Sequence, residues 1–144
     1  MKKIKYLYTS LLMMAIAALC LLDFTDLSHK MPTVSSLDKF IHGGMYFVLS
    51  VLLMWEYRGR KKIFPGRDLE ASIYADTGHM YRLFWAVLLI CAVFGGLLEY
   101  LQGLTGYRSM EQADLTADVL GGLFAYLIYY VTALSVQSKT DKQA

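Results

Sequence analysis

Ionisable side chains recur at helical spacing in this sequence. Asp38, His42 and Tyr46 follow one another at intervals of four residues, so they lie along one face of a helix. Asp114 and Asp118 repeat the same interval further along the chain. Imidazole and carboxylate groups serve as general bases and acids, and they also bind amines, hydroxyls and metal ions. These residues are therefore the first candidates for a functional site.

A second polar pair interrupts a long apolar stretch. Glu99 and Gln102 are three residues apart at the end of "FWAVLLICAVFGGLLEYLQG", where they share a helix face. An ionised carboxylate at the centre of a membrane helix costs about 2.5–3.5 kcal/mol on insertion scales, so Glu99 requires a partner. Outside the loop that follows the first apolar run, the basic candidates are Lys39, His42 and Arg108. We expect Glu99 and Gln102 to form one wall of a polar pocket.

Four apolar runs must position these residues. The chain has 144 residues, of which 56% are hydrophobic and only 18% charged, and a soluble domain of this size cannot bury so much apolar surface. The runs at residues 6–24, 40–57, 83–102 and 116–136 are long enough to cross a hydrocarbon core of about 30 Å. The sequence therefore predicts an all-α integral membrane protein, with residues 1–144 forming a single domain built as a four-transmembrane-helix bundle.

The basic residues predict the orientation of this bundle. Of the 14 Lys and Arg residues, 11 lie at the two termini and around the loop between the second and third runs, whereas three lie on the opposite side. The positive-inside rule then makes both termini cytoplasmic, in a multi-pass protein of the bacterial cytoplasmic membrane. The candidate site residues meet at the outer face, where the second and fourth runs begin and the third ends. We interpret the net charge of +2 as a topology signal, not as a nucleic-acid patch.

The first run has two interpretations. The basic start "MKKIK" is typical of a signal peptide, but the apolar stretch that follows is longer than the usual length of about 7–15 residues. A clear cleavage site is missing, and Cys20 lacks the small preceding residue of a lipoprotein site. We therefore expect an uncleaved membrane anchor. Cys20 and Cys91 have no metal-ligand spacing, and we expect them to be buried packing residues.

A purely structural role for the polar residues remains open. Asp38 and Asp114 stand where they could cap their helices. Buried polar pairs can also join membrane helices, at an average of about 0.6 kcal/mol each. Glycine pairs at 43–44, 95–96 and 121–122 would let the helices approach closely. The convergence of so many ionisable groups on one face favours a functional site.

Two segments resemble the motifs of the VanZ-like membrane protein family. "DKFIHGGMYFVL" resembles its Asp-Lys-x-x-His-x-x-x-Tyr element, and "EYLQGLTGYRSMEQADLTADVLGGLFA" resembles its second element, which begins Glu-x-x-Gln. The resemblance covers residues 38–125. It departs from the family at Gly43, where an aromatic residue is common, and at Asp118, where Asn is common. The positions that match the motif are Asp38, Lys39, His42, Tyr46, Glu99, Gln102, Arg108, Asp114 and either Gly121 or Gly122.

The resemblance implies an activity at the outer membrane face. The namesake of the family is associated with low-level resistance to teicoplanin, but no settled reaction comes with the family. We predict a non-enzymatic protein whose outer pocket binds a membrane lipid, a cell-wall precursor or the headgroup of a glycopeptide-type amphiphile. Lys39 and Arg108 would hold a phosphate or carboxylate, and the acids, Asp118 among them, would receive amines or hydroxyls.

Other function classes remain open. A membrane-embedded enzyme would use His42, Asp38 and Glu99 as acid and base groups, although no hydrolase or metalloprotease motif is present. A metal held by these three residues is conceivable, but this face carries a single His, and we expect neither a metal nor a cofactor. A transporter is disfavoured because four short helices show no internal repeat.

Overall fold

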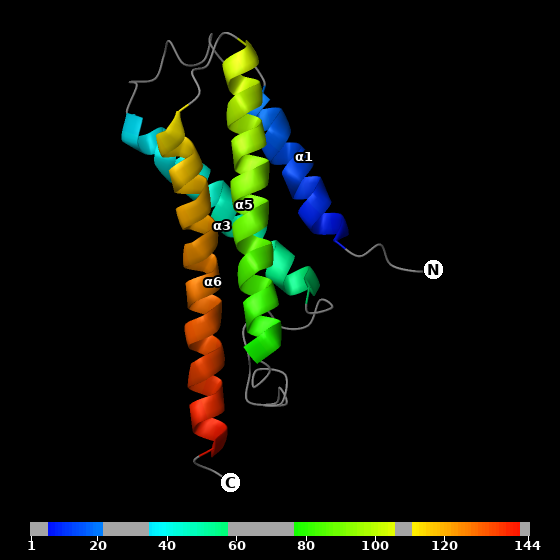
Figure 1. Ribbon diagram of the computed structural model, residues 1–144, viewed down its shortest axis with the longest axis vertical. Coiled ribbons are helices and arrows are strands. Elements are labelled where there is room, and N and C mark those ends of the chain that lie inside the picture. The colour runs from blue at the N-terminus through cyan, green and yellow to red at the C-terminus, as the bar shows by residue number, and fades with distance from the viewer. Residues whose placement is uncertain (1–5, 22–34, 58–76, 106–110, 142–144) are drawn as a thin grey trace.

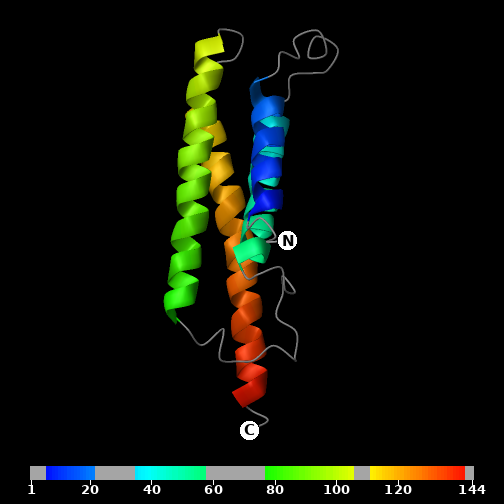
Figure 2. The same cartoon turned by 90° about the vertical axis from the view of Figure 1, so that its right-hand side faces the viewer.

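The computed structural model describes residues 6–21, 35–57, 77–105 and 111–141, and these residues form four α-helices. The helices are α1 (Leu7–Leu21), α3 (Ser35–Tyr57), α5 (Thr77–Thr105) and α6 (Gln112–Asp141). In Figure 1, α5 and α6 stand side by side along the long axis, and α3 crosses obliquely behind them. The turned view in Figure 2 shows α1 alongside α3. The predicted all-α class is confirmed.

Three of the four described helices are long and apolar enough to cross a membrane. The crossing stretches are Leu37–Tyr57, Met80–Thr105 and Gln112–Ser135, which contain or largely overlap the predicted runs 40–57, 83–102 and 116–136. The remaining described helix, α1, has 15 residues. At 1.5 Å per residue its length is about 22 Å, less than the hydrocarbon core of about 30 Å. The predicted first span, 6–24, is therefore a shorter apolar helix here, and residues 22–24 lie outside the described part of the chain.

Apolar side chains occupy both the interior and the outer surface of the bundle. Tyr46, Leu49, Leu83 and Tyr129 are buried in the core, while large apolar residues such as Phe40 are exposed. Helices that are apolar on every side are suited to a hydrocarbon environment, where the outer surface contacts lipid. Cys20 and Cys91 are both buried, as predicted.

Helices α3 and α6 form the most extensive contact in the bundle. Both begin at the same end of the molecule, so they run in the same direction (Figure 1). Gly43 and Gly121 set their closest approach: a Cβ atom added to Gly121 would come within 3.0 Å of the Gly43 backbone. Only glycine fits at position 121 without a shift of one helix, which is how small residues allow membrane helices to pack tightly. This contact holds the first turns of α3 and α6 opposite each other.

Polar contacts hold α1 at both of its ends. Near the end of α3, the Glu56 carboxylate accepts the backbone N–H groups of Tyr8 at 3.1 Å and Thr9 at 2.9 Å. It also accepts the Thr9 hydroxyl at 2.8 Å. Since the first amides of a helix have no partner within the helix, a carboxylate at this point satisfies them and complements the helix dipole. At the other end, Gln102 Nε2 on α5 donates to the Cys20 carbonyl oxygen at 3.0 Å.

Candidate functional site

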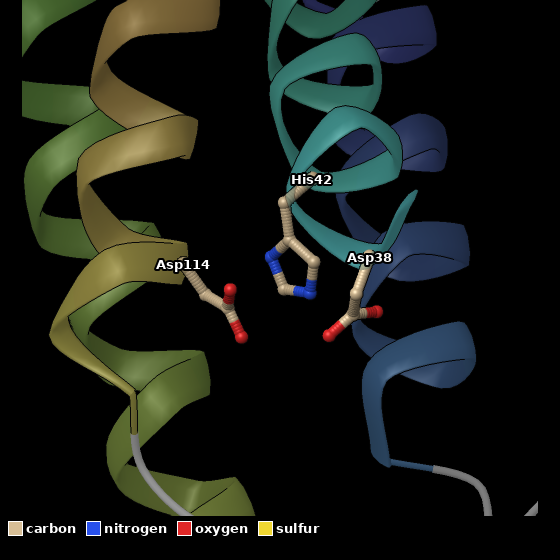
Figure 3. A group of neighbouring side chains, drawn as sticks. All are labelled: Asp38, His42 and Asp114. Carbon is tan, nitrogen blue, oxygen red and sulfur yellow. The ribbon is translucent and has the colours of Figure 1, made fainter. Parts of the chain in front are cut away.

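Three side chains converge where α3 and α6 begin. Asp38 and His42 lie one turn apart on α3, and Asp114 lies in the first turn of α6. Figure 3 shows the two carboxylates approaching the imidazole ring from the two helices. Each residue can offer one nitrogen or oxygen atom, and these three atoms all lie within 4.8 Å of one another. His42 and Asp114 are buried, whereas Asp38 is half-buried.

Asp118 lies one turn beyond Asp114 on α6 and contacts the imidazole ring at its Nδ1 atom. Asp118 Oδ1 is 3.1 Å from His42 Nδ1, and the two residues are only 1% and 3% exposed. A Cβ atom added to Gly95 on α5 would lie 2.7 Å from Asp118 Oδ2 and 3.3 Å from the Tyr46 hydroxyl. The missing side chain at Gly95 therefore makes room for a carboxylate enclosed by three helices. His42 is held in one orientation and keeps its second ring nitrogen for other partners.

Glu99 reaches from α5 to the start of α6. Its Oε2 accepts the backbone N–H of Glu111 at 3.0 Å, and the Glu111 carbonyl in turn accepts the amide of Asp114 at 3.1 Å. Glu99 is 1% exposed, and its Oε1 has no hydrogen-bond donor among the described residues. An unsatisfied buried oxygen is costly in a membrane interior, so this atom is available to a ligand or an additional partner.

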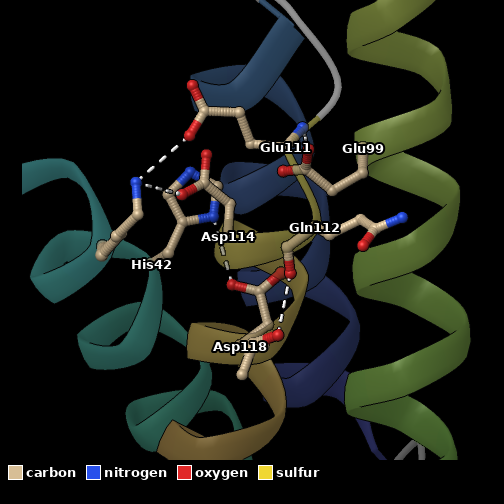
Figure 4. A network of polar contacts seen from close by, with 8 residues as sticks. His42, Glu99, Glu111, Gln112, Asp114 and Asp118 are labelled. Atoms are coloured by element: carbon tan, nitrogen blue, oxygen red, sulfur yellow. Dashed lines mark hydrogen bonds and ion pairs between the residues drawn. The ribbon is translucent and has the colours of Figure 1, made fainter. Parts of the chain in front are cut away.

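Lys39 lies at the edge of these acids. Its Nζ is 3.1 Å from Glu111 Oε2 and 3.5 Å from Asp114 Oδ1. Figure 4 shows the network of acids around His42 to which these two acids belong. About a third of the Lys39 side chain is exposed, so solvent screens these ion pairs and they add little stability. Their effect is instead to place a cation beside the buried carboxylates.

We call this group the polar cluster. It comprises seven described residues: Asp38, Lys39, His42, Glu99, Glu111, Asp114 and Asp118. Five of them carry carboxylates, one is a lysine and one a histidine. The cluster can accept hydrogen bonds from hydroxyl and ammonium groups and can ligate a cation. The His42–Asp118 pair also has the form of a base held in place by a carboxylate.

One predicted site residue points elsewhere. Gln102 does not join the acids, because its amide donates to the Cys20 carbonyl and faces α1. Tyr46 is buried, and its hydroxyl lies next to Asp118 Oδ2 where Gly95 leaves space. Arg108 lies outside the described residues. The remaining predicted residues are all members of the polar cluster.

The proposed capping roles need revision. Helix α3 begins at Ser35 and α6 at Gln112, so Asp38 and Asp114 lie within the first turn of each helix and do not precede it. An acid in the first turn is still favourable, because it faces the positive end of the helix dipole. Both side chains turn toward His42 (Figure 3).

Sequence reasoning missed two acids. Glu111 was overlooked because it precedes the fourth apolar run, although it pairs with Lys39 and donates its amide to Glu99. Glu56 was overlooked because it lies near the predicted end of the second run. The position of Glu56 inside an apolar run was the signal that could have found it, because a carboxylate there requires a partner.

An apolar groove adjoins the polar cluster on the surface of α3 and α6. It has a volume of about 580 Å³. Its lining comprises Lys39, Phe40, Gly43, Gly44, Phe47, Ala117, Leu120, Gly121 and Phe124. Of the described members of the polar cluster, Lys39 alone contributes to this lining. Gly44 leaves the floor of the groove open, because an added Cβ atom would meet nothing within 4 Å.

The family model named VanZ/LLP1 matches residues 6–134 of this chain. The chain belongs to the VanZ/LLP1 family. The match covers most of the chain and begins at α1, so it extends well beyond the resemblance over residues 38–125. All members of the polar cluster and of the groove lie inside the matched range of this VanZ/LLP1 protein. No similar curated protein and no similar solved structure was found.

Proposed function

We propose that this VanZ/LLP1 protein binds an amphiphile, with the headgroup at the polar cluster and an acyl or isoprenoid chain in the adjoining groove. The observation that carries the proposal is the position of Lys39, which belongs to both the cluster and the groove. A molecule that follows Lys39 passes from the buried carboxylates to a largely apolar surface. Membrane lipids, lipid-linked cell-wall precursors and acylated glycopeptides all combine these two parts.

The polar cluster favours headgroups that donate hydrogen bonds. Glu99 Oε1 and Asp114 Oδ1 are buried and have no hydrogen-bond donor among the described residues. A hydroxyl or ammonium group would supply one, and such charge-assisted bonds are about twice as strong as neutral ones. An anionic group would instead compete with Glu111 and Asp114 for Lys39. Arg108 remains a predicted second cation for such a group.

The groove suits one hydrocarbon chain. Its volume of about 580 Å³ falls within the range of about 300–1,000 Å³ common for small-molecule sites. Phe40, Phe47 and Phe124 supply apolar walls, and the glycines at 43 and 44 keep the floor low. In a membrane such a groove lies beside lipid, so a chain can enter it laterally.

The location of the site rests on the proposed topology. We propose four membrane-associated helices with both termini in the cytoplasm of a bacterial cell, because 11 of the 14 basic residues fall on one side. The polar cluster then faces the outer surface of the cytoplasmic membrane. Lipid-linked cell-wall precursors and glycopeptide antibiotics are encountered at that surface.

A pair of glycine variants tests the groove. Gly44→Leu would fill the groove, whereas Gly96→Leu places the same side chain on α5 outside the groove lining. Both positions leave an added Cβ atom in open space, so both variants are expected to fold. We expect Gly44→Leu to lose the lipids that copurify with the wild-type protein, measured by mass spectrometry after detergent exchange, and Gly96→Leu to keep them. Equal lipid retention by the two variants would contradict the proposal.

A membrane enzyme is the second candidate, and the His42–Asp118 pair favours it. The pair is buried and separated by 3.1 Å, a geometry that suits a general base and its orienting carboxylate. An enzyme would convert the bound amphiphile, so its product should appear in lipid extracts of cells that express the wild-type protein. Extracts from cells that express His42→Gln should lack this product. Identical extracts would favour a binding protein without chemistry.

A further inference from the structure

We infer that Asp38, His42 and Asp114 form a binding site for a divalent transition-metal ion at the start of α3 and α6. From the sequence, Asp38, His42 and Glu99 were considered as ligands and a metal was not expected. In the structure, Asp114 takes the place of Glu99 in the group. The inference uses neither the groove nor Lys39, but it shares the buried oxygens of Asp114 and Glu99 with the proposed headgroup site, so zinc binding and lipid retention are measured separately.

The geometry fits a single ion. One ligand atom from each of the three residues lies within 4.8 Å of the other two. Metal–ligand bonds of about 2.0–2.2 Å place neighbouring ligand atoms about 3–4 Å apart, so only small side-chain rotations are needed. Figure 3 shows a ring nitrogen of His42 facing the space between the two carboxylates. The residues come from two helices that are locked together by the contact between Gly43 and Gly121.

Asp118 supplies the support that metal-binding histidines usually have. A ligating imidazole almost always donates its second N–H to a carboxylate or carbonyl, which fixes its tautomer and ring orientation. Here Asp118 Oδ1 lies 3.1 Å from His42 Nδ1, which leaves Nε2 as the ligand atom. Asp118 projects from α6 toward α3 and α5, where Gly95 makes room for its carboxylate. The ring is therefore oriented before any ion arrives.

The excess negative charge of the cluster also favours a bound cation. Among the described residues it contains five carboxylates but only one lysine and one histidine. Burying uncompensated charge costs several kcal/mol per ion, so a divalent ion would relieve much of this repulsion. Lys39 does not fill this role for the whole cluster, since its closer partner is the more exposed Glu111, at 3.1 Å.

Unsatisfied oxygens provide an observation that does not depend on the ligand spacing. Asp114 Oδ1 and Glu99 Oε1 are both buried and have no hydrogen-bond donor among the described residues, although Asp114 Oδ1 is 3.5 Å from Lys39 Nζ. Figure 4 shows the Glu99 carboxylate directed toward the side of the cluster that holds Asp114. A metal ion, or water bound to that ion, would satisfy these atoms.

The donor set points to a first-row ion such as Zn²⁺. One imidazole nitrogen with two carboxylate oxygens is softer than the all-oxygen sites of Mg²⁺ and Ca²⁺. Three protein ligands also leave at least one coordination position open, as in zinc sites that bind water or a substrate. A phosphate, carboxylate or hydroxyl group could occupy that position.

Zinc binding to the purified protein tests the inference. Tag-free full-length protein in detergent would be stripped with chelator, titrated with Zn²⁺ and analysed for bound metal after desalting. We expect about one Zn²⁺ per wild-type chain and at least a tenfold loss of affinity in Asp114→Asn and in His42→Gln. Asp118→Asn should lower the affinity about 10–100-fold, the usual effect of removing a supporting partner. Mg²⁺ at equal concentration should not compete.

Glu56→Gln is the matched control, because Glu56 is also a buried acid on α3 but lies beside α1 at the far end of the helix. It should bind Zn²⁺ like the wild type. Zn²⁺ should also raise the thermal unfolding midpoint of the wild-type protein, which keeps the test valid if a ligand variant fails to fold. Two results would overturn the inference: a wild-type protein that neither binds nor is stabilised by Zn²⁺, or unchanged Zn²⁺ affinity in folded Asp114→Asn and His42→Gln.

Discussion

Asp118 Oδ1 lies 3.1 Å from His42 Nδ1, and this buried contact joins two helices across 76 positions of sequence. The pair depends on the parallel packing of α3 and α6, in which Gly43 and Gly121 allow the two backbones to touch. Removing that close approach should separate the imidazole from its carboxylate. The polar cluster and the glycine contact therefore form one structural unit.

Gly121→Ala should destabilise the protein. The added Cβ atom would enter the Gly43 backbone, which cannot move without shifting α3. Overpacking of this kind costs about 1–3 kcal/mol, measured as a loss of unfolding free energy in detergent. Gly96→Ala is the matched control, because its Cβ atom would meet nothing within 4 Å. Equal stability of Gly121→Ala and Gly96→Ala would argue against the close contact of α3 and α6.

Glu56→Ala should loosen α1 from the bundle. The substitution leaves the amides of Tyr8 and Thr9 without their carboxylate partner, and an unsatisfied buried group costs about 1–3 kcal/mol. Glu56→Gln keeps one acceptor oxygen and should lose less stability than Glu56→Ala. Thermal unfolding would measure both changes. A wild-type midpoint for Glu56→Ala would mean that the Glu56 contacts do not stabilise the packing of α1.

Reporter fusions should place the two ends of α5 on opposite sides of the membrane. A reporter after Lys62 should be cytoplasmic and one after Arg108 external, because the basic residues are concentrated on the Lys62 side. Phosphatase and fluorescent-protein fusions give complementary signals for the two locations. The same location for both reporters would exclude the proposed topology and would remove the polar cluster from the outer face.

Much of the fold could be predicted from the sequence, because membrane helices are encoded locally. The lengths of the apolar runs predict α3, α5 and α6. The four-residue spacing of Asp38 and His42 predicts that they lie on one face of α3. Alternation of chain direction then predicts which helix ends meet. The convergence of His42 with Asp114 and Asp118 follows from these rules together with the glycine positions.

The remaining contacts depend on distances between helices, which no local pattern contains. Gln102 shares a helix face with Glu99, yet it bonds to the Cys20 carbonyl on α1. Glu56 supports α1 because α3 ends beside the first turn of that helix. Its type and position signal that a partner exists, but only the packed bundle identifies the partner.

Glu99→Gln would show most directly whether the polar cluster is a site or a scaffold. The glutamine side-chain oxygen can still accept the Glu111 amide, and its NH₂ group can donate to a neighbouring acid, so the fold should persist. Its charge is lost, however, and a hydrogen bond to a charged group contributes about 1.5–3 kcal/mol, equivalent to a tenfold or greater change in affinity.

The measurement is the amount of lipid retained by purified Glu99→Gln, determined together with its thermal unfolding midpoint and expression level. Glu56→Gln serves as the control, since it makes the same change in a buried acid outside the cluster. We expect Glu99→Gln to lose at least nine-tenths of the lipid retained by the wild type, in keeping with a roughly tenfold weaker site, while its midpoint and expression stay near wild type. Wild-type lipid retention by Glu99→Gln, or a loss that only parallels a loss of folded protein, would contradict a binding role for the polar cluster.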